Sequence, residues 1–159
     1  MLFTLIAAIA IIALRLVLFN MGLPAEGTDF MLVHFLAIVT VVYFADARLL
    51  RAEPRSGFPD LLREGFRQAA LYAVLMLGFL WFYYTQVEDS LFQERIDERV
   101  AMAVVEGQPE ALVRERMERF FTPFNYATIT FFALLAVGAV QTFVIGLLHH
   151  KVMRRYAQR

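Results

Sequence analysis

Four blocks of apolar residues divide this chain, and they restrict its fold more than any other feature. The blocks cover residues 1–19, 30–44, 69–84 and 126–148. A helix that crosses the roughly 30 Å hydrocarbon core of a bilayer needs about 20 residues. The first and last blocks reach that length alone, and the two middle blocks reach it when polar flanking residues are counted as helix. The pattern therefore predicts four membrane-spanning helices.

The composition agrees with a membrane protein. Apolar residues make up 60% of the chain and charged residues 19%, against about 45–50% and about 25% in soluble domains. No block alternates with the period of two expected for barrel strands. The alternative is a soluble protein with unusually apolar core helices. We expect an all-α fold, a single integral membrane domain over 1–159 built as a four-helix bundle. The expected spans are about 1–19, 28–50, 66–86 and 124–150.

The first block also has the apolar character of a cleaved signal peptide. It lacks the basic start of such a peptide, and Arg15 interrupts its apolar stretch. No clear small-residue cleavage site follows it. We interpret this block as a retained membrane anchor.

The distribution of charge predicts the orientation, because cytoplasmic loops are enriched in Lys and Arg. Five arginines lie in segment 45–68, and segment 20–29 has two acidic residues and no basic one. The C-terminal tail adds Lys151, Arg154, Arg155 and Arg159. These segments place both termini in the cytoplasm and segment 86–122 outside. Localisation in a cytoplasmic membrane, with several passes, follows as an expectation.

The outer segment, about 87–122, reads as a helical hairpin. Its first half has an apolar stripe at helical spacing, formed by Phe92, Ile96, Val100, Ala103 and Val104. No break separates span three from this stripe, which allows one long helix. Pro109 begins a second amphipathic helix, and Thr122–Pro123 reads as the cap and first position of span four. The stripes either pack against each other or on lipid, or they form a docking site for an extracytoplasmic partner.

Several function classes find no support in the sequence. The chain has no cysteine, which excludes disulfides and thiolate metal sites. It contains no phosphate-binding loop, no zinc-protease motif, no serine-hydrolase elbow and no dinucleotide fingerprint. Fifteen basic and fifteen acidic residues balance, so there is no general attraction to nucleic acid. We expect no catalytic residue, no cofactor, no metal and no nucleic-acid partner.

Ionisable residues inside a membrane are candidates for function, because their burial is costly. Arg15 and His34 are expected at similar depth, beneath the outer loop that carries Glu26 and Asp29. A cluster of these four residues near the outer leaflet would bind an anionic lipid headgroup or relay protons. The simpler interpretation is that Arg15 snorkels outward and His34 packs between helices with one hydrogen bond.

Two further groups of residues lie in or after the fourth span. Gly138, Thr142 and Gly146 recur every four residues and form a small-residue face that permits close helix packing, within the bundle or between protomers. Gln141 lies beside Thr142 in the middle of the span, and it suits an interhelical hydrogen bond or a substrate path. His149 and His150 are adjacent, so they diverge on a helix and do not form a metal pair. With the basic tail they resemble an interfacial anchor.

The order of these elements resembles a known family. The features are GFPDLLREGFRQAALYAV entering span three, an acidic helix, a GQPE turn, FFTPF opening the last span, and a basic tail. This order is similar to the four-span membrane proteins of the domain of unknown function 4199 family, over nearly the whole chain and best over 57–150. The resemblance implies a small bacterial protein of the inner membrane, and it implies no activity, cofactor or site residue.

We expect a non-enzymatic accessory or scaffolding protein that binds membrane lipids and either another membrane protein or itself. The small-residue face and the outer hairpin would carry the contacts. One alternative is a small oligomeric transporter or channel, in which Arg15, His34 and Gln141 would line the route. A lipid-binding protein, or an enzyme acting on lipid, is the remaining alternative.

Overall fold

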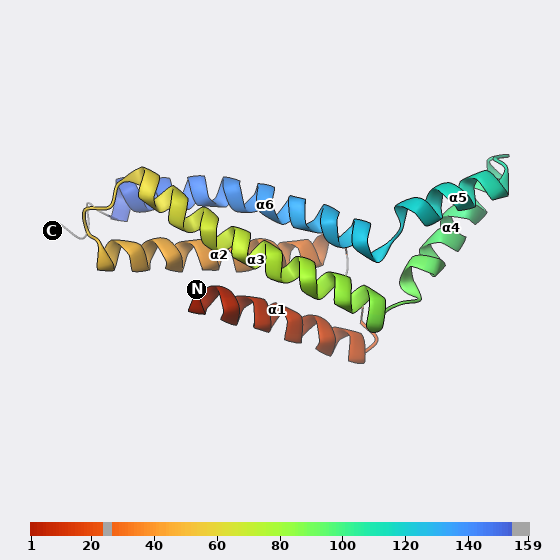
Figure 1. Ribbon diagram of the computed structural model, residues 1–159, viewed down its shortest axis with the longest axis horizontal. Helices are drawn as coiled ribbons and strands as arrows, with labels where there is room; N and C mark the ends of the chain where they lie inside the picture. Colours follow the sequence, from red (N-terminus) through yellow and green to blue (C-terminus); the bar gives the residue numbers. More distant parts are fainter. Residues whose placement is uncertain (24–26, 154–159) are drawn as a thin grey trace. The chain divides into compact units, whose positions relative to one another are not determined.

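The part of the chain that the structure describes consists of helices joined by short loops, and no strand occurs in it. The computed structural model describes the backbone of residues 1–23 and 27–153, and the side chains of 1–23 and 30–152. Six α-helices are followed by a π-helical turn (Figure 1). They are α1 (Leu2–Asn20), α2 (Gly27–Ala52), α3 (Phe58–Gln86), α4 (Leu91–Val105), α5 (Glu110–Phe120), α6 (Pro123–Leu148) and η1 (His149–Met153). The helices of the described residues confirm the predicted all-α class.

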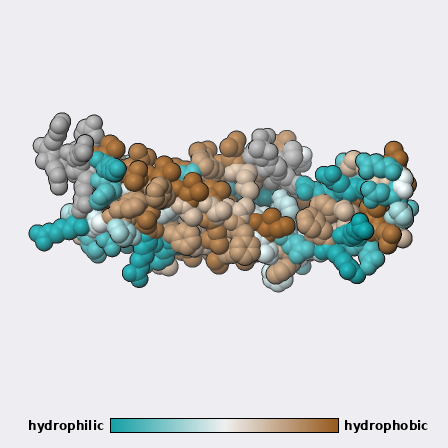
Figure 2. Space-filling view, turned by 90° about the horizontal axis from the view of Figure 1, so that it is seen from above, coloured by the Kyte–Doolittle hydropathy of each residue, from teal (hydrophilic) through white to brown (hydrophobic). Residues whose placement is uncertain are grey.

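Four helices are long and apolar enough to cross a membrane. They cover Leu2–Asn20, Phe30–Ala52, Phe58–Gln86 and Pro123–Val152. On the face that Figure 2 shows, brown, hydrophobic side chains gather over the middle of the molecule. These observations identify a multi-pass membrane protein.

The start of the third span differs from the expected boundary. The third span begins at Phe58 instead of about residue 66, so the expected loop 45–68 shrinks to residues 53–57. The Asp60 carboxylate accepts a hydrogen bond from the Gly57 amide at 2.7 Å, and Pro59 in the first turn needs no amide partner. These caps start the helix two turns earlier than hydropathy suggests.

The third span and the first helix of the hairpin are two separate helices, α3 and α4. The one long helix over both, which the sequence allows, is not present. The chain breaks between Gln86 and Leu91, where the amides of Val87 and Glu88 both donate to the Tyr83 carbonyl. At the other end, the Thr122 hydroxyl accepts from the Asn125 amide at 3.1 Å, and α6 begins at Pro123. The predicted cap at Thr122–Pro123 is therefore confirmed.

The chain divides into two compact units. The first unit contains residues up to Leu75 and from Phe132 onward, and the second contains Met76–Phe131. In the second unit, the buried ring of Tyr84 contacts Phe92 and Tyr126 edge-on, with centroids 5.1 and 5.0 Å away. The α4–α5 hairpin adds its own core of Ile96, Val100 and Val113. The hydrophobic stripes of the hairpin helices thus face each other.

The core of the first unit mixes apolar and polar side chains. Large apolar residues are fully buried, among them Ile38, Val42, Leu61 and Leu134. Polar and charged residues are buried beside the apolar ones: Thr4, Arg15, His34, Asp46, Ser56, Gln68, Thr142 and His149. Membrane domains place such groups inside because lipid offers them no hydrogen-bond partner. These buried polar side chains define the candidate sites.

Candidate functional site

The most deeply buried charged group of the first unit is Asp46, on α2. Its carboxylate faces the imidazole of His149, with Oδ2 3.5 Å from Nδ1. The exposed fractions of the two side chains are 0% and 2%. The separation exceeds an ordinary hydrogen bond, and neither side chain has a hydrogen-bond partner among the described residues. A buried acid and base thus face each other at the ends of two spans.

The local backbone explains why His149 reaches this position. The last α-helical residue of α6 is Leu148, and the chain continues as the π-helical turn η1. A π-helical turn rotates the following side chains relative to an α-helix, and such turns are common at functional sites. The His149 ring also lies 4.9 Å from the Tyr43 ring, centroid to centroid. Tyr43 and Asp46 are three residues apart and share one face of α2, so α2 holds the imidazole from two points.

The Asp46–His149 pair can hold a proton without net charge. One proton shared between the two groups leaves the pair neutral overall, while its loss or the gain of a second leaves a buried charge. A metal site is less suited to these residues, because no group of three His, Asp or Glu side chains gathers in the described part of the chain. The pair therefore offers proton binding or structural pairing.

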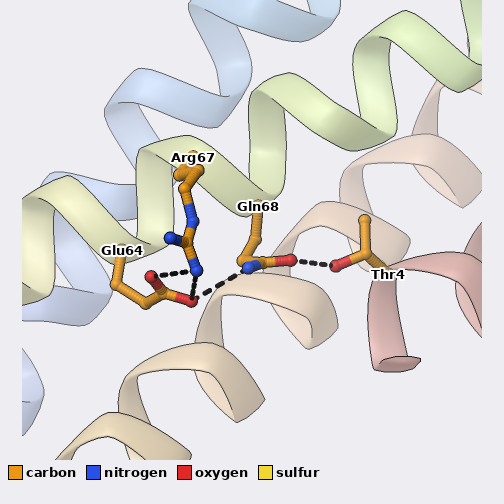
Figure 3. A network of polar contacts seen from close by, with 4 residues as sticks. All are labelled: Thr4, Glu64, Arg67 and Gln68. Carbon is orange, nitrogen blue, oxygen red and sulfur yellow. Dashed lines mark hydrogen bonds and ion pairs between the residues drawn. The ribbon is translucent and has the colours of Figure 1, made fainter. Parts of the chain in front are cut away.

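A second polar network joins α1 to α3 (Figure 3). The Thr4 hydroxyl donates to the Gln68 carbonyl oxygen at 2.6 Å, and the Gln68 amide donates to Glu64 at 2.9 Å. Arg67 completes the network with an ion pair of 2.8 Å to the other carboxylate oxygen of Glu64. The network begins in the buried core and ends at the surface, because Thr4 is 1% exposed and the Arg67 side chain 66%.

A pocket of about 440 Å³ lies beside this network. Glu64 and Arg67 of α3 form one wall, and α2 forms the other. The full lining is Met1, Ala45, Arg48, Leu49, Ala52, Glu53, Glu64 and Arg67. This volume falls in the range of about 300–1,000 Å³ typical of small-molecule sites. It is a charged pocket at the end of apolar helices.

The predicted cluster around Arg15 is only partly within the described residues. Arg15 is buried, and its guanidinium carbon lies 5.0 Å from the Phe30 ring centroid. His34 is buried as well, with Nδ1 2.7 Å from the Tyr72 hydroxyl. Glu26 and the Asp29 side chain lie outside the described residues. The structure therefore joins His34 to Tyr72 of α3, a partner that the sequence reading did not name.

The small-residue face of α6 lies against α3 within the same chain. A Cβ atom added to Gly138 would come 2.8 Å from the Cβ of Ala69. Next to it, Gly65 of α3 has only 2.9 Å between its own added Cβ and Thr142. Gly146 faces Phe58, Leu61 and Leu62 at ordinary contact distances. The two helices approach closely at these positions, so this face is occupied inside the first unit.

The hairpin has a polar flank and an apolar tip. Arg114 of α5 donates to Asp97 of α4 at 2.8 Å across the hairpin, and this hydrogen bond raises the pKa of Arg114. The tip between the two helices turns at Gly107, where φ is +84°. Around it, Met102, Val104, Val105 and Leu112 are all exposed, Val105 to 88%. A small hairpin thus presents apolar side chains where its charged flanks end.

The sequence reading missed the Asp46–His149 pair. It assigned Asp46 to a loop and His149 to an interfacial anchor, because strictly apolar runs underestimate helix length. One usable signal was present, since Asp46 comes two residues after the second apolar block and His149 directly follows the fourth. The predicted orientation brings both block ends to the same side of the membrane. Gln141, the other polar candidate of α6, is half-buried.

Comparison with protein family models, with curated proteins and with solved structures finds no match for this chain. The resemblance to the domain of unknown function 4199 family therefore stays a prediction. The class defined by the structure is a helical multi-pass membrane protein.

Proposed function

We propose that this chain is a non-enzymatic accessory protein that binds another membrane protein through the apolar tip of its α4–α5 hairpin. The four spans form an antiparallel four-helix bundle in a bacterial cytoplasmic membrane. Both termini lie in the cytoplasm, and the hairpin lies on the outer side. The excess of Lys and Arg in segments 45–68 and 149–159 supports this orientation. The bacterial assignment rests on the family resemblance.

The exposed tip carries this proposal. Val105 is 88% exposed and Leu112 53%, although the same hairpin buries Ile96 and Val100 almost completely. The hairpin therefore does not need these tip residues for its own core. Contiguous exposed apolar residues rimmed by charges are typical of protein-binding sites. The tip offers such a site on a stable base.

The packing of α6 also favours the hairpin as the binding element. The sequence left open whether Gly138, Thr142 and Gly146 contact another protomer. Their contacts with Ala69, Gly65 and Leu62 of α3 occupy this face inside the chain. The hairpin tip is then the more available of the two surfaces expected to bind a partner.

The test is extraction of the protein from its native membrane into lipid nanodiscs, followed by mass spectrometry of the proteins retained. We expect one partner at fixed stoichiometry, lost in the Val105→Asp variant. Gln108→Asp is the matched control, since it adds the same charge at the tip without removing an apolar side chain. Retention of the partner by Val105→Asp, or recovery of the chain alone, would contradict the proposal.

A further inference from the structure

The ends of α2 and α3 extend past the start of α1 and leave a groove that α1 does not cover. Phe3 of α1 stacks on Phe44 with ring centroids 4.9 Å apart, and Thr4 bonds Gln68. These contacts set the level at which α1 begins. From that level α2 runs eight residues further to Ala52, which is about 12 Å at 1.5 Å per residue. α3 starts ten residues earlier at Phe58, about 15 Å away. No part of α1 covers this stretch.

The pocket of about 440 Å³ lies in this groove. Its α2 wall is formed by one helix face, with Ala45, Arg48, Leu49 and Ala52 at spacings of three, four and seven, followed by Glu53. Four of the lining side chains are charged, two of each sign.

The charged side chains of the pocket differ in whether they form ion pairs. Arg67 and Glu64 neutralise each other at 2.8 Å. Arg48 and Glu53 form no ion pair with any residue that the structure describes, and both are exposed. Among the side chains that line the pocket, Arg48 is the available cation and Glu53 the available anion. Together they complement a zwitterion whose anionic group meets Arg48 and whose cationic group meets Glu53.

The order of these two charges along α2 specifies the ligand. The apolar block of this span ends at Phe44, then Arg48 follows, and Glu53 lies beyond the last helical residue, Ala52. Arg48 is therefore nearer the apolar part of the span and Glu53 nearer water. A phospholipid has the same arrangement, with its phosphate next to the glycerol and its amine outermost. Arginine is suited to phosphate, which it binds with two parallel hydrogen bonds.

We propose that this groove binds the headgroup of an amine-bearing zwitterionic phospholipid, phosphatidylethanolamine in class. Arg48 donates to the phosphate, and the Glu53 carboxylate accepts hydrogen bonds from the ammonium. A choline headgroup satisfies Arg48 equally but has no N–H to donate to Glu53. A glycerol headgroup has no positive charge for Glu53 at all.

The rim of the groove favours a lipid over a soluble phosphate ester. Leu2, Phe3 and Phe44 are exposed to 64%, 46% and 41%, and they lie at the level where the groove meets the apolar part of the spans. Acyl chains of a bound lipid would cover these side chains. A soluble phosphoethanolamine would leave them uncovered, so it gains only the headgroup contacts.

The test is a lipid titration of the delipidated full-length protein in detergent, read by native mass spectrometry. The probes are phosphatidylethanolamine, phosphatidylcholine and phosphatidylglycerol with identical acyl chains. We expect the ethanolamine lipid to bind about tenfold more tightly than the other two, as one charge-assisted hydrogen bond implies. Soluble phosphoethanolamine at the same concentration should displace none of it. Equal binding of all three lipids, or displacement by soluble phosphoethanolamine, would overturn the proposal.

Substitutions in the groove test whether the preference for phosphatidylethanolamine arises there. Arg48→Ala should weaken binding of phosphatidylethanolamine about tenfold. Glu53→Lys should reverse the preference toward phosphatidylglycerol, a gain that misfolding does not produce. Arg51→Ala is the matched control, because Arg51 is an exposed arginine of α2 outside the pocket lining. An effect of Arg51→Ala equal to that of Arg48→Ala, or an unchanged preference in Glu53→Lys, would overturn the proposal. The hairpin is intact throughout, so the result is independent of the protein partner proposed above.

Discussion

The first unit and the α4–α5 hairpin have opposite distributions of polarity. In the first unit, Asp46, Gln68 and Thr4 are buried, whereas Ile9 and Val140 are exposed to 64% and 63%. In the hairpin, Ile96 and Val100 are buried, and charged pairs such as Asp97–Arg114 lie outside. Each arrangement suits a different solvent, because lipid satisfies no polar group and water disfavours apolar surface. The comparison shows that one short chain contains a region suited to lipid and another suited to water.

The largest effect is expected where a charge is buried without water. Asp46→Ala leaves His149 without its acidic partner inside the first unit. Removal of one member of a buried pair costs about 3–5 kcal/mol. Unfolding of the purified protein in mixed micelles with increasing denaturing detergent measures this loss. The double variant Asp46→Leu with His149→Leu should recover most of it, because an apolar pair needs no hydrogen bonds.

Asp89→Ala is the control, since Asp89 is exposed between α3 and α4. A loss as large in Asp89→Ala as in Asp46→Ala would show that the buried pair has no special role. A double Leu variant less stable than Asp46→Ala would argue that the pair is itself a net stabilising contact.

A single substitution made in both regions tests the comparison itself. Ile9→Asp places a carboxylate on the lipid-facing surface of α1 and should cost about 3 kcal/mol of membrane insertion. Val105→Asp changes an even more exposed apolar residue, and its effect on stability should stay within about 0.5 kcal/mol. Glycosylation-based insertion assays and unfolding in micelles provide the two values. Similar costs at both positions would contradict the assignment of different solvents.

Close helix packing gives an intermediate effect. Gly138→Ala would place its Cβ 2.8 Å from that of Ala69, and overpacking of this kind costs about 1–3 kcal/mol. Gly78→Ala is the matched control, because no atom lies within 4 Å of its added Cβ. Alanine there should be neutral or stabilise α3 by up to about 1 kcal/mol. If both variants behave alike in micelle unfolding, the α3–α6 contact is looser than described.

The smallest effect is expected on the hairpin surface. Arg114→Ala removes the hydrogen bond to Asp97, but exposed pairs contribute little and are screened by salt. The pKa of Arg114 is raised above the ordinary arginine value, mainly by the hydrogen bond to Asp97. Its contribution is therefore fully present below the ordinary arginine pKa and is lost only as pH rises through the still higher folded pKa. Thermal unfolding should therefore show a small Arg114→Ala difference that is unchanged between pH 7 and 10 and absent at high salt. A pH-dependent difference in that range would assign the effect to another group.

Much of the architecture was predictable because hydropathy and helical periodicity are local signals. The four spans and the hairpin stripe of Ile96 and Val100 follow from residue spacing alone. The start of α3 at Phe58 was not predictable from hydropathy, because it depends on a capping hydrogen bond in a polar segment. The length of the second span in turn decides whether Asp46 is assigned to a helix or to a loop.

The polar contacts were harder to predict than the spans. His34 was recognised as a candidate, but its partner Tyr72 looked like one of many aromatic residues in span three. His149 meets Asp46 only because η1 follows α6 and the end of α2 lies opposite. Such pairs depend on the rotation of one helix against another, which a single sequence does not specify.

Cysteine labelling tests most directly that the two regions face different solvents on the predicted sides. The natural chain has no cysteine, so single variants Ile9→Cys, Arg51→Cys and Gln108→Cys give signals without background. With a membrane-impermeant maleimide, we expect Gln108→Cys to react in intact cells and Arg51→Cys only after permeabilisation. Ile9→Cys should react in neither condition. Labelling of Arg51→Cys in intact cells, or of Ile9→Cys in either condition, would contradict the account.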